Sequence, residues 1–169
     1  MNLTYNVNEE ISLDSDIGHT ARGAYAEAAG QSKESKLAVS EVIINRAKDN
    51  RKPSSRNGYT EQFSNVTNPK EVMTQKTQFQ SLKKPRYTKP LSITGGDGAG
   101  GTKRNEIETK AFSDSMGAAI NATYNNTNTT DGATYFYSPT AKAPRWSKVL
   151  KEVNVPGVSK KEFKFYKYN

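Results

Sequence analysis

The chain has 169 residues, no cysteine, one histidine and a formal net charge of +8. This length suits one domain with a single core, and the lack of cysteine excludes disulfides, thiolate metal sites and a cysteine nucleophile. The charge favours a polyanionic partner, which could be nucleic acid, an anionic membrane surface or a cell-wall polymer.

Residues 1–18 are mostly polar, and their few apolar residues alternate with polar ones only in part. This pattern predicts an extended N-terminal arm before a single domain at 19–169. Apolar residues at Ile17, Ala21, Ala24 and Ala28 recur at helical spacing, and Tyr25 joins them, so a helix with one buried face is predicted. Gly30 is the candidate C-cap of this helix.

Glu27 lies at the edge of that apolar face, beside Gly23, Ala24, Ala26 and Ala28. With such small neighbours its carboxylate can face a groove while its base is partly desolvated. Partial desolvation disfavours the charged form of a carboxyl group, as a proton donor near neutral pH requires. From spacing alone, a solvated surface glutamate is the more frequent outcome.

A second helix is predicted over residues 33–48, after the capping pattern that starts at Ser32. It is apolar over most of its surface, which predicts a buried central element. Residues 49–58 have the composition of an exposed loop, and Pro69 suits the first turn of a short helix.

The stretch 94–102 meets the formal glycine spacing of a dinucleotide-binding loop. No series of strands and helices surrounds it, and no lysine stands where a phosphate-binding loop needs one, so we interpret it as a flexible loop. Residues 105–123 then predict a third long helix, with a capping signature at Asn105 to Glu108 and Ile107 on its apolar side.

Residues 132–137 are the best strand candidate, and Tyr135 and Tyr137 would share one face of it. Two tyrosines on one face offer a flat surface on which a sugar can stack, although one core face and one solvent face is the simpler alternative. Trp146 is expected in the core. Residues 162–168 alternate lysine with aromatics, as a half-buried strand or sheet edge would.

Several motifs in this order resemble the spore-cortex-lytic enzyme family of bacterial cell-wall hydrolases. The resemblance covers roughly residues 19 to 166. The motifs are Tyr25-Ala-Glu27-Ala, a Gly/Ser turn, Ala38-Val39, Val42-Ile43-Ile44-Asn45-Arg46, Glu71-Val72, Gln78-Phe79, Asp131 to Pro139, Pro144-Arg145-Trp146 and Phe163-Lys-Phe165-Tyr166. The chain departs from the family where Tyr135 replaces a frequent histidine and where the glycine-rich stretch looks like an insertion.

The resemblance implies an α+β, mainly helical, lysozyme-like domain with a small β element near the C-terminus. It also implies a lytic transglycosylase in which Glu27 alone cuts peptidoglycan between N-acetylmuramic acid and N-acetylglucosamine and leaves a 1,6-anhydro end. The expected substrate contacts are Gln78, Phe79, Tyr135, Tyr137 and Tyr25. For Gln78 and Phe79, a loop cap and a core residue are equally good interpretations.

Elimination among reaction types agrees with this chemistry. A serine hydrolase would need His19 as its base, yet no nucleophile elbow is present, and one histidine without cysteine makes a zinc hydrolase improbable. We therefore expect no cofactor and no metal. A hydrolytic muramidase or glucosaminidase would need a second carboxylate, for which Asp131 and Glu41 are only guesses.

The expected partner is the peptidoglycan glycan strand, and the expected place of action is the cell wall, in the periplasm, outside the cell or in the spore cortex. The sequence has no apolar run of membrane-spanning length and no signal peptide. Leaderless delivery or a removed leader would explain this, and a toxin role would add a cognate inhibitor or secretion component as a partner. The alternatives are a non-catalytic wall-binding module and a basic nucleic-acid-binding protein, for which no recognised motif is found.

Overall fold

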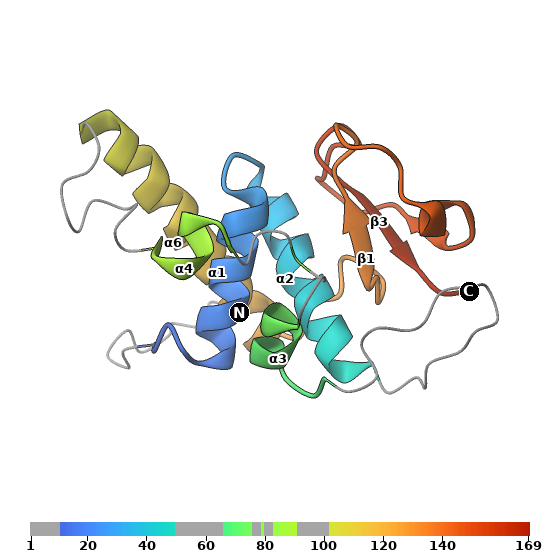
Figure 1. The fold of residues 1–169 in the computed structure, drawn as a ribbon, viewed down its shortest axis with the longest axis horizontal. Helices are drawn as coiled ribbons and strands as arrows, with labels where there is room; N and C mark the ends of the chain where they lie inside the picture. Colours follow the sequence, from blue (N-terminus) through green and yellow to red (C-terminus); the bar gives the residue numbers. More distant parts are fainter. Residues whose placement is uncertain (1–10, 50–65, 76–78, 80–82, 91–101) are drawn as a thin grey trace.

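Three helices form the main body of the protein. The computed structural model describes residues 11–49, 66–75, 79, 83–90 and 102–169. In it α1 (Asp16–Ala28), α2 (Lys33–Lys48) and α6 (Thr102–Tyr124) all pack against one another. The short helices α3 (Pro69–Thr74) and α4 (Pro85–Thr88) pack on α1, and α3 also contacts α2 (Figure 1).

A small antiparallel sheet lies on the other side of α2 from α1 (Figure 1). Its strands are β1 (Tyr135–Tyr137), β2 (Lys151–Val153) and β3 (Lys164–Lys167), in the order β1-β3-β2, and the 3₁₀ helix η2 (Arg145–Lys148) precedes β2. The α+β, mainly helical, lysozyme-like class is confirmed. β3, the strand expected within residues 162–168, is the central strand of the sheet. It pairs with β1 on one edge and on the other edge with β2, a strand that the sequence did not predict.

The buried central position predicted for α2 is confirmed. Ala38, Val39, Val42 and Ile43 have no exposed surface, because helices pack on one side of α2 and the sheet on the other. Ser32 caps the helix and accepts a hydrogen bond from the backbone N–H of Ser35.

A distant carboxylate completes the N-terminal cap of α2. Glu162, near the C-terminus, accepts hydrogen bonds from the Ser32 hydroxyl at 2.9 Å and from the Ser35 hydroxyl at 2.7 Å. These bonds lower the pKa of Glu162 even though partial burial opposes the change. The last strand is thereby held against the start of α2.

The ends of α1 differ from the prediction. The helix begins at Asp16 after the N-cap Ser15, so the last three residues of the predicted arm are helical. It ends at Ala28, and Ala29 is the C-cap in right-handed helical conformation. Gly30 is therefore not the cap, because this terminus uses no left-handed residue.

The start of α6 also corrects the sequence interpretation. The helix begins at Thr102, so Asn105 is not its N-cap, and Ile107 is 61% exposed instead of packed. Glu108 turns inward because its carboxylate accepts hydrogen bonds from Arg86 Nε at 3.0 Å and Nη2 at 2.6 Å, and from the Tyr25 hydroxyl. This buried network joins α1, α4 and α6.

We expect opposite effects from two glycine-to-alanine changes within helices. A Cβ on Gly18 would lie 2.4 Å from the Ser12 carbonyl oxygen and 2.5 Å from that of Leu13, whereas a Cβ on Gly117 would meet nothing within 4 Å. Gly18→Ala should lower the free energy of unfolding by about 1–3 kcal/mol, and Gly117→Ala should raise it by about 0.5–1 kcal/mol. Urea denaturation checks both, and a stabilised Gly18→Ala variant would contradict the close approach of residues 12–13.

Candidate active site

Glu27 lies in the last turn of α1, with its side chain half-buried. Among the described residues its carboxylate takes part in no hydrogen bond or ion pair, and its negative charge interacts with the guanidinium of Arg46. Glu27 is therefore neither fully solvated nor locked in a buried ion pair with a described residue.

Arg46 occupies the last turn of α2 and is the residue around which the site assembles. Its guanidinium carbon lies 4.7 Å from the ring centroid of Phe79 and 5.9 Å from that of Tyr135, and its Nε donates to the Thr134 carbonyl at 2.7 Å. Burial lowers the pKa of Arg46 to about 10, while the negative charge of Glu27 opposes this change. The guanidinium therefore stays charged at neutral pH.

Two consecutive side chains of α2 hold the chain that enters β1. The Asn45 side-chain amide donates to the Ala133 carbonyl at 2.9 Å, and Arg46 donates to the next carbonyl, that of Thr134. The Thr134 N–H in turn donates to the Tyr166 carbonyl of β3. Tyr135 is thereby fixed beside Arg46 through hydrogen bonds to the backbone that precedes it.

The sequence interpretation gave Arg46 no role, although it lies within the Val42 to Arg46 motif. The available signal was an arginine at the end of a helix that is otherwise predicted to be buried. A charge in such a place needs partners from elsewhere in the fold, and those partners, Thr134, Phe79 and Tyr135, come from distant parts of the sequence.

Tyr135 and Tyr137 share one face of β1, and the inward-facing Phe136 packs on Phe163 and Phe165. Both tyrosines keep part of their surface exposed. Trp146, which we expected in the core, is half-buried and lies 5.1 Å from the Tyr135 ring and 5.8 Å from the Tyr137 ring, centroid to centroid. Its position follows from η2, which carries it over this face of the sheet.

The other predicted contacts have different places. Phe79 is 5% exposed and packs on Phe136, so it is a core residue whose ring supports Arg46. Tyr25 has no exposed surface, and its hydroxyl donates to Glu108. A side chain without exposed surface cannot contact a glycan, so we leave Tyr25 out of the site. Gln78 lies outside the described residues.

The two carboxylates considered as partners for Glu27 both have structural roles. Glu41 is 2% exposed and accepts hydrogen bonds from the backbone N–H groups of Thr129 and Thr130, at 3.0 and 2.8 Å. Asp131 is exposed and forms an ion pair with Lys167, which lowers the pKa of Asp131. Neither carboxylate is thus free to activate a water molecule.

His19 forms part of a hydrogen-bonded chain at the start of α1. Its Nδ1 lies 2.7 Å from the Tyr87 hydroxyl, and its Nε2 lies 3.0 Å from Asp14 Oδ1. Arg22 stacks on the Tyr87 ring, with 4.4 Å between the guanidinium carbon and the ring centroid. This arrangement joins α4 to α1, and it contains no serine nucleophile.

The comparison with known protein families decides the class of the protein. A family model described as Cell Wall Hydrolase matches residues 30–163, most of the chain. The chain belongs to the cell wall hydrolase family. This confirms the resemblance to the spore-cortex-lytic enzymes and makes the protein a peptidoglycan-cleaving enzyme that acts on the cell wall. No curated protein and no solved structure matches.

The family match begins at Gly30 and therefore does not include Glu27, whereas it does include Arg46, Tyr135 and Trp146. Within the described part of this cell wall hydrolase, no group of three or more His, Asp or Glu side chains could hold a metal ion. No helix found there is long and apolar enough to cross a membrane.

The buried His19 should make stability depend on pH below neutrality. Burial lowers the pKa of His19 more than the Asp14 contact raises it, so between the ordinary value of about 6.5 and the lower folded value the unfolded chain binds the additional proton. Stability therefore falls as the pH drops below about 6.5, and the lowered pKa of Asp14 continues the loss in more acidic solution.

This prediction is checked by thermal unfolding of the wild type and His19→Gln across mildly acidic pH. The chain has only one histidine, so the substitution should remove most of the pH dependence between about 5 and 7. If the stability of the two proteins changed with pH in parallel, His19 would not be the cause of the pH dependence.

Proposed function

We propose that this cell wall hydrolase is a lytic transglycosylase in which Glu27 is the only catalytic acid and base. The observation that supports this most is the placement of its carboxylate: it is half-exposed, acted on by the charge of Arg46, and not engaged by any described hydrogen-bond donor. A reaction without water needs only one such group, whereas hydrolysis by two carboxylates needs a second.

In the proposed reaction, protonated Glu27 donates its proton to the glycosidic oxygen that links C1 of N-acetylmuramic acid to C4 of N-acetylglucosamine. The bond from C1 to that oxygen breaks, the N-acetylglucosamine residue leaves as an alcohol, and positive charge develops at C1. The Glu27 carboxylate then removes the proton of the muramyl C6 hydroxyl, whose oxygen bonds to C1. Glu27 ends protonated, and the product has a 1,6-anhydro ring.

Arg46 is proposed to stabilise the carboxylate that Glu27 becomes after the first proton transfer. A buried cation interacts with a nearby anion more strongly than a solvated one, because less water screens it. The Thr134 carbonyl and the rings of Phe79 and Tyr135 keep the guanidinium in place. The electrostatic environment is therefore present before the reaction begins, which is the favourable arrangement for catalysis.

The sugar rings are proposed to lie against Tyr135 and Tyr137. Both side chains are partly exposed on one face of β1, and Tyr135 contacts Arg46. A glycan that stacks on Tyr135 would therefore pass close to the charged pair. Gln78, which can donate to and accept from the acetamido group of a sugar, stays a predicted contact.

Replacing Glu27 with Gln should abolish cleavage, because an amide cannot donate or remove the proton at these steps. Glu106, an exposed glutamate on α6, provides the matched control, and Glu106→Gln should leave activity unchanged. The measurement is mass spectrometry of soluble fragments released from purified sacculi. Anhydro-muropeptides support the lytic reaction, reducing-end products indicate a muramidase or glucosaminidase, and products from Glu27→Gln would refute the assignment.

The charge of Arg46 is tested by comparing Arg46→Lys with Arg46→Met. Both substitutions remove the planar group that stacks on Phe79, but only lysine keeps a cation near Glu27. We expect kcat/KM of the lysine variant to exceed that of the methionine variant by about tenfold, equivalent to about 1.4 kcal/mol of transition-state stabilisation. Circular dichroism establishes that both variants are folded, and equal rates would exclude an electrostatic role.

A further inference from the structure

Five aromatic side chains gather on the face of the sheet opposite to Phe136 and Phe165. This aromatic face consists of Tyr135, Tyr137, Trp146, Tyr166 and Tyr168. Trp146 lies at its centre, with its ring centroid 5.1 to 5.8 Å from those of Tyr135, Tyr137 and Tyr166. Tyr168 joins through a 2.7 Å hydrogen bond between its hydroxyl and that of Tyr135.

Strand alternation places the tyrosines of β1 and β3 on one face of the sheet. Tyr135 pairs with Tyr166 across β1 and β3, and directly opposite residues of an antiparallel pair lie on the same face. Phe136 and Phe165 form the next pair and point toward α2. Four of the five rings of the aromatic face keep exposed surface, and only Tyr166 is buried.

The same part of the chain carries most of the net positive charge. Residues 142–169 contain eight lysines or arginines and two glutamates, a net +6 of the chain's total of +8. Such a concentration within 28 residues is an attractive field for an anion.

Three of these cations lie on η2 and β3, which also carry Trp146 and Tyr166, and have no acidic partner among the described residues. Arg145 and Lys148 are exposed on η2, one 3₁₀ turn apart on the same side of that helix. Lys164 lies opposite Tyr137 in the strand register and so shares its face. Glu152, the carboxylate on this face, is already paired with Lys160 at 3.2 Å.

We propose that the aromatic face and these three cations form a binding surface for an uncleaved stretch of peptidoglycan strand. Sugar rings would stack on Trp146 and the tyrosines, and the carboxylates of the stem peptides would pair with Arg145, Lys148 and Lys164. Charge complementarity together with flat aromatic surface selects this occupant, because a peptidoglycan strand carries both sugars and carboxylates. Tyr135 connects this surface to Arg46, so one strand could occupy both.

The proposal extends the function proposed above, but its test does not depend on bond cleavage. The Arg145→Glu/Lys148→Glu double variant reverses two exposed charges of the surface. The control is the Lys83→Glu/Lys84→Glu double variant, which changes the net charge by the same amount. Both lysines are exposed and directly precede α4. α4 lies on the opposite side of the helices from the sheet (Figure 1). All proteins carry Glu27→Gln, and retention on purified sacculi is measured at low and high salt.

The Arg145→Glu/Lys148→Glu variant should bind sacculi about tenfold more weakly than the control at low salt, and the difference should shrink as salt screens the charges. Trp146→Ala should lower retention at both salt concentrations, provided its circular dichroism is unchanged. Equal binding by the two charge variants would overturn the proposal whatever the Trp146 variant does.

A second experiment distinguishes binding to peptide carboxylates from binding to phosphate polymers of the wall. Sacculi stripped of phosphate polymers should keep the difference between the two charge variants, whereas sacculi whose peptide carboxylates have been amidated should lose it. The reverse result would assign the surface to a phosphate polymer and overturn the proposal. Release of fragments by Glu27→Gln would instead refute the catalytic assignment and leave the binding result standing.

Discussion

The interaction on which the candidate site depends is the contact between the end of α2 and the start of β1. Asn45 and Arg46 donate to the carbonyls of Ala133 and Thr134, so the sheet is placed on the helices by hydrogen bonds from two neighbouring side chains. The same guanidinium then packs on Phe79 and acts on Glu27. A buried charge is costly unless polar partners compensate its desolvation, and the hydrogen bond from Arg46 to the Thr134 carbonyl joins α2 to the chain that enters β1.

Carboxylates have a similar structural use elsewhere in the fold. Glu41 holds Thr129 and Thr130, Glu108 holds Arg86 and Tyr25, and Glu162 holds the cap of α2. Only 33% of the residues are hydrophobic, so the core is small and these charge-assisted bonds supply connections between distant elements. A carboxylate used in this way is not available for chemistry. Glu27 differs from these three carboxylates because no described hydrogen-bond donor contacts it.

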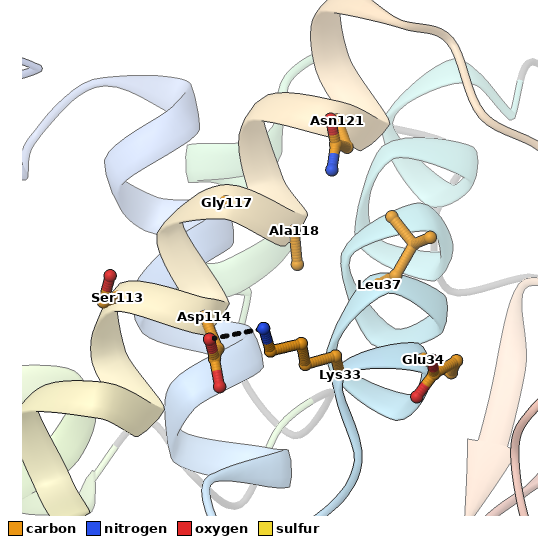
Figure 2. A pocket seen from close by; sticks show the side chains of 8 residues that line it. All are labelled: Lys33, Glu34, Leu37, Ser113, Asp114, Gly117, Ala118 and Asn121. Carbon is orange, nitrogen blue, oxygen red and sulfur yellow. Dashed lines mark ion pairs between the residues drawn. The ribbon is translucent and has the colours of Figure 1, made fainter. Parts of the chain in front are cut away.

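A pocket lies between the start of α2 and the second half of α6 (Figure 2). Lys33, Leu37 and Asp114 are among its lining residues, and Lys33 reaches Asp114 at 3.6 Å across it (Figure 2). Lys110 also pairs with Asp114, at 2.8 Å, and these lysines lower the pKa of Asp114 against the effect of partial burial. The pocket is thus bridged by one ion pair, between Lys33 and Asp114, and belongs to the packing of the two helices.

The sequence by itself determined the helices α1, α2 and α3, the strand at Tyr135 to Tyr137, and the family, because periodicity, caps and motif order are local properties of the chain. It also indicated Glu27, since small neighbours on a helix can be read from spacing, although its catalytic role stays a proposal. Only the tertiary structure decided that Arg46 joins Glu27 to Tyr135, that Tyr25 and Glu108 are buried together, and that Trp146 lies on the sheet with the tyrosines. These contacts join residues far apart in the sequence, and a buried charge or an aromatic face acquires its partners only when the chain folds.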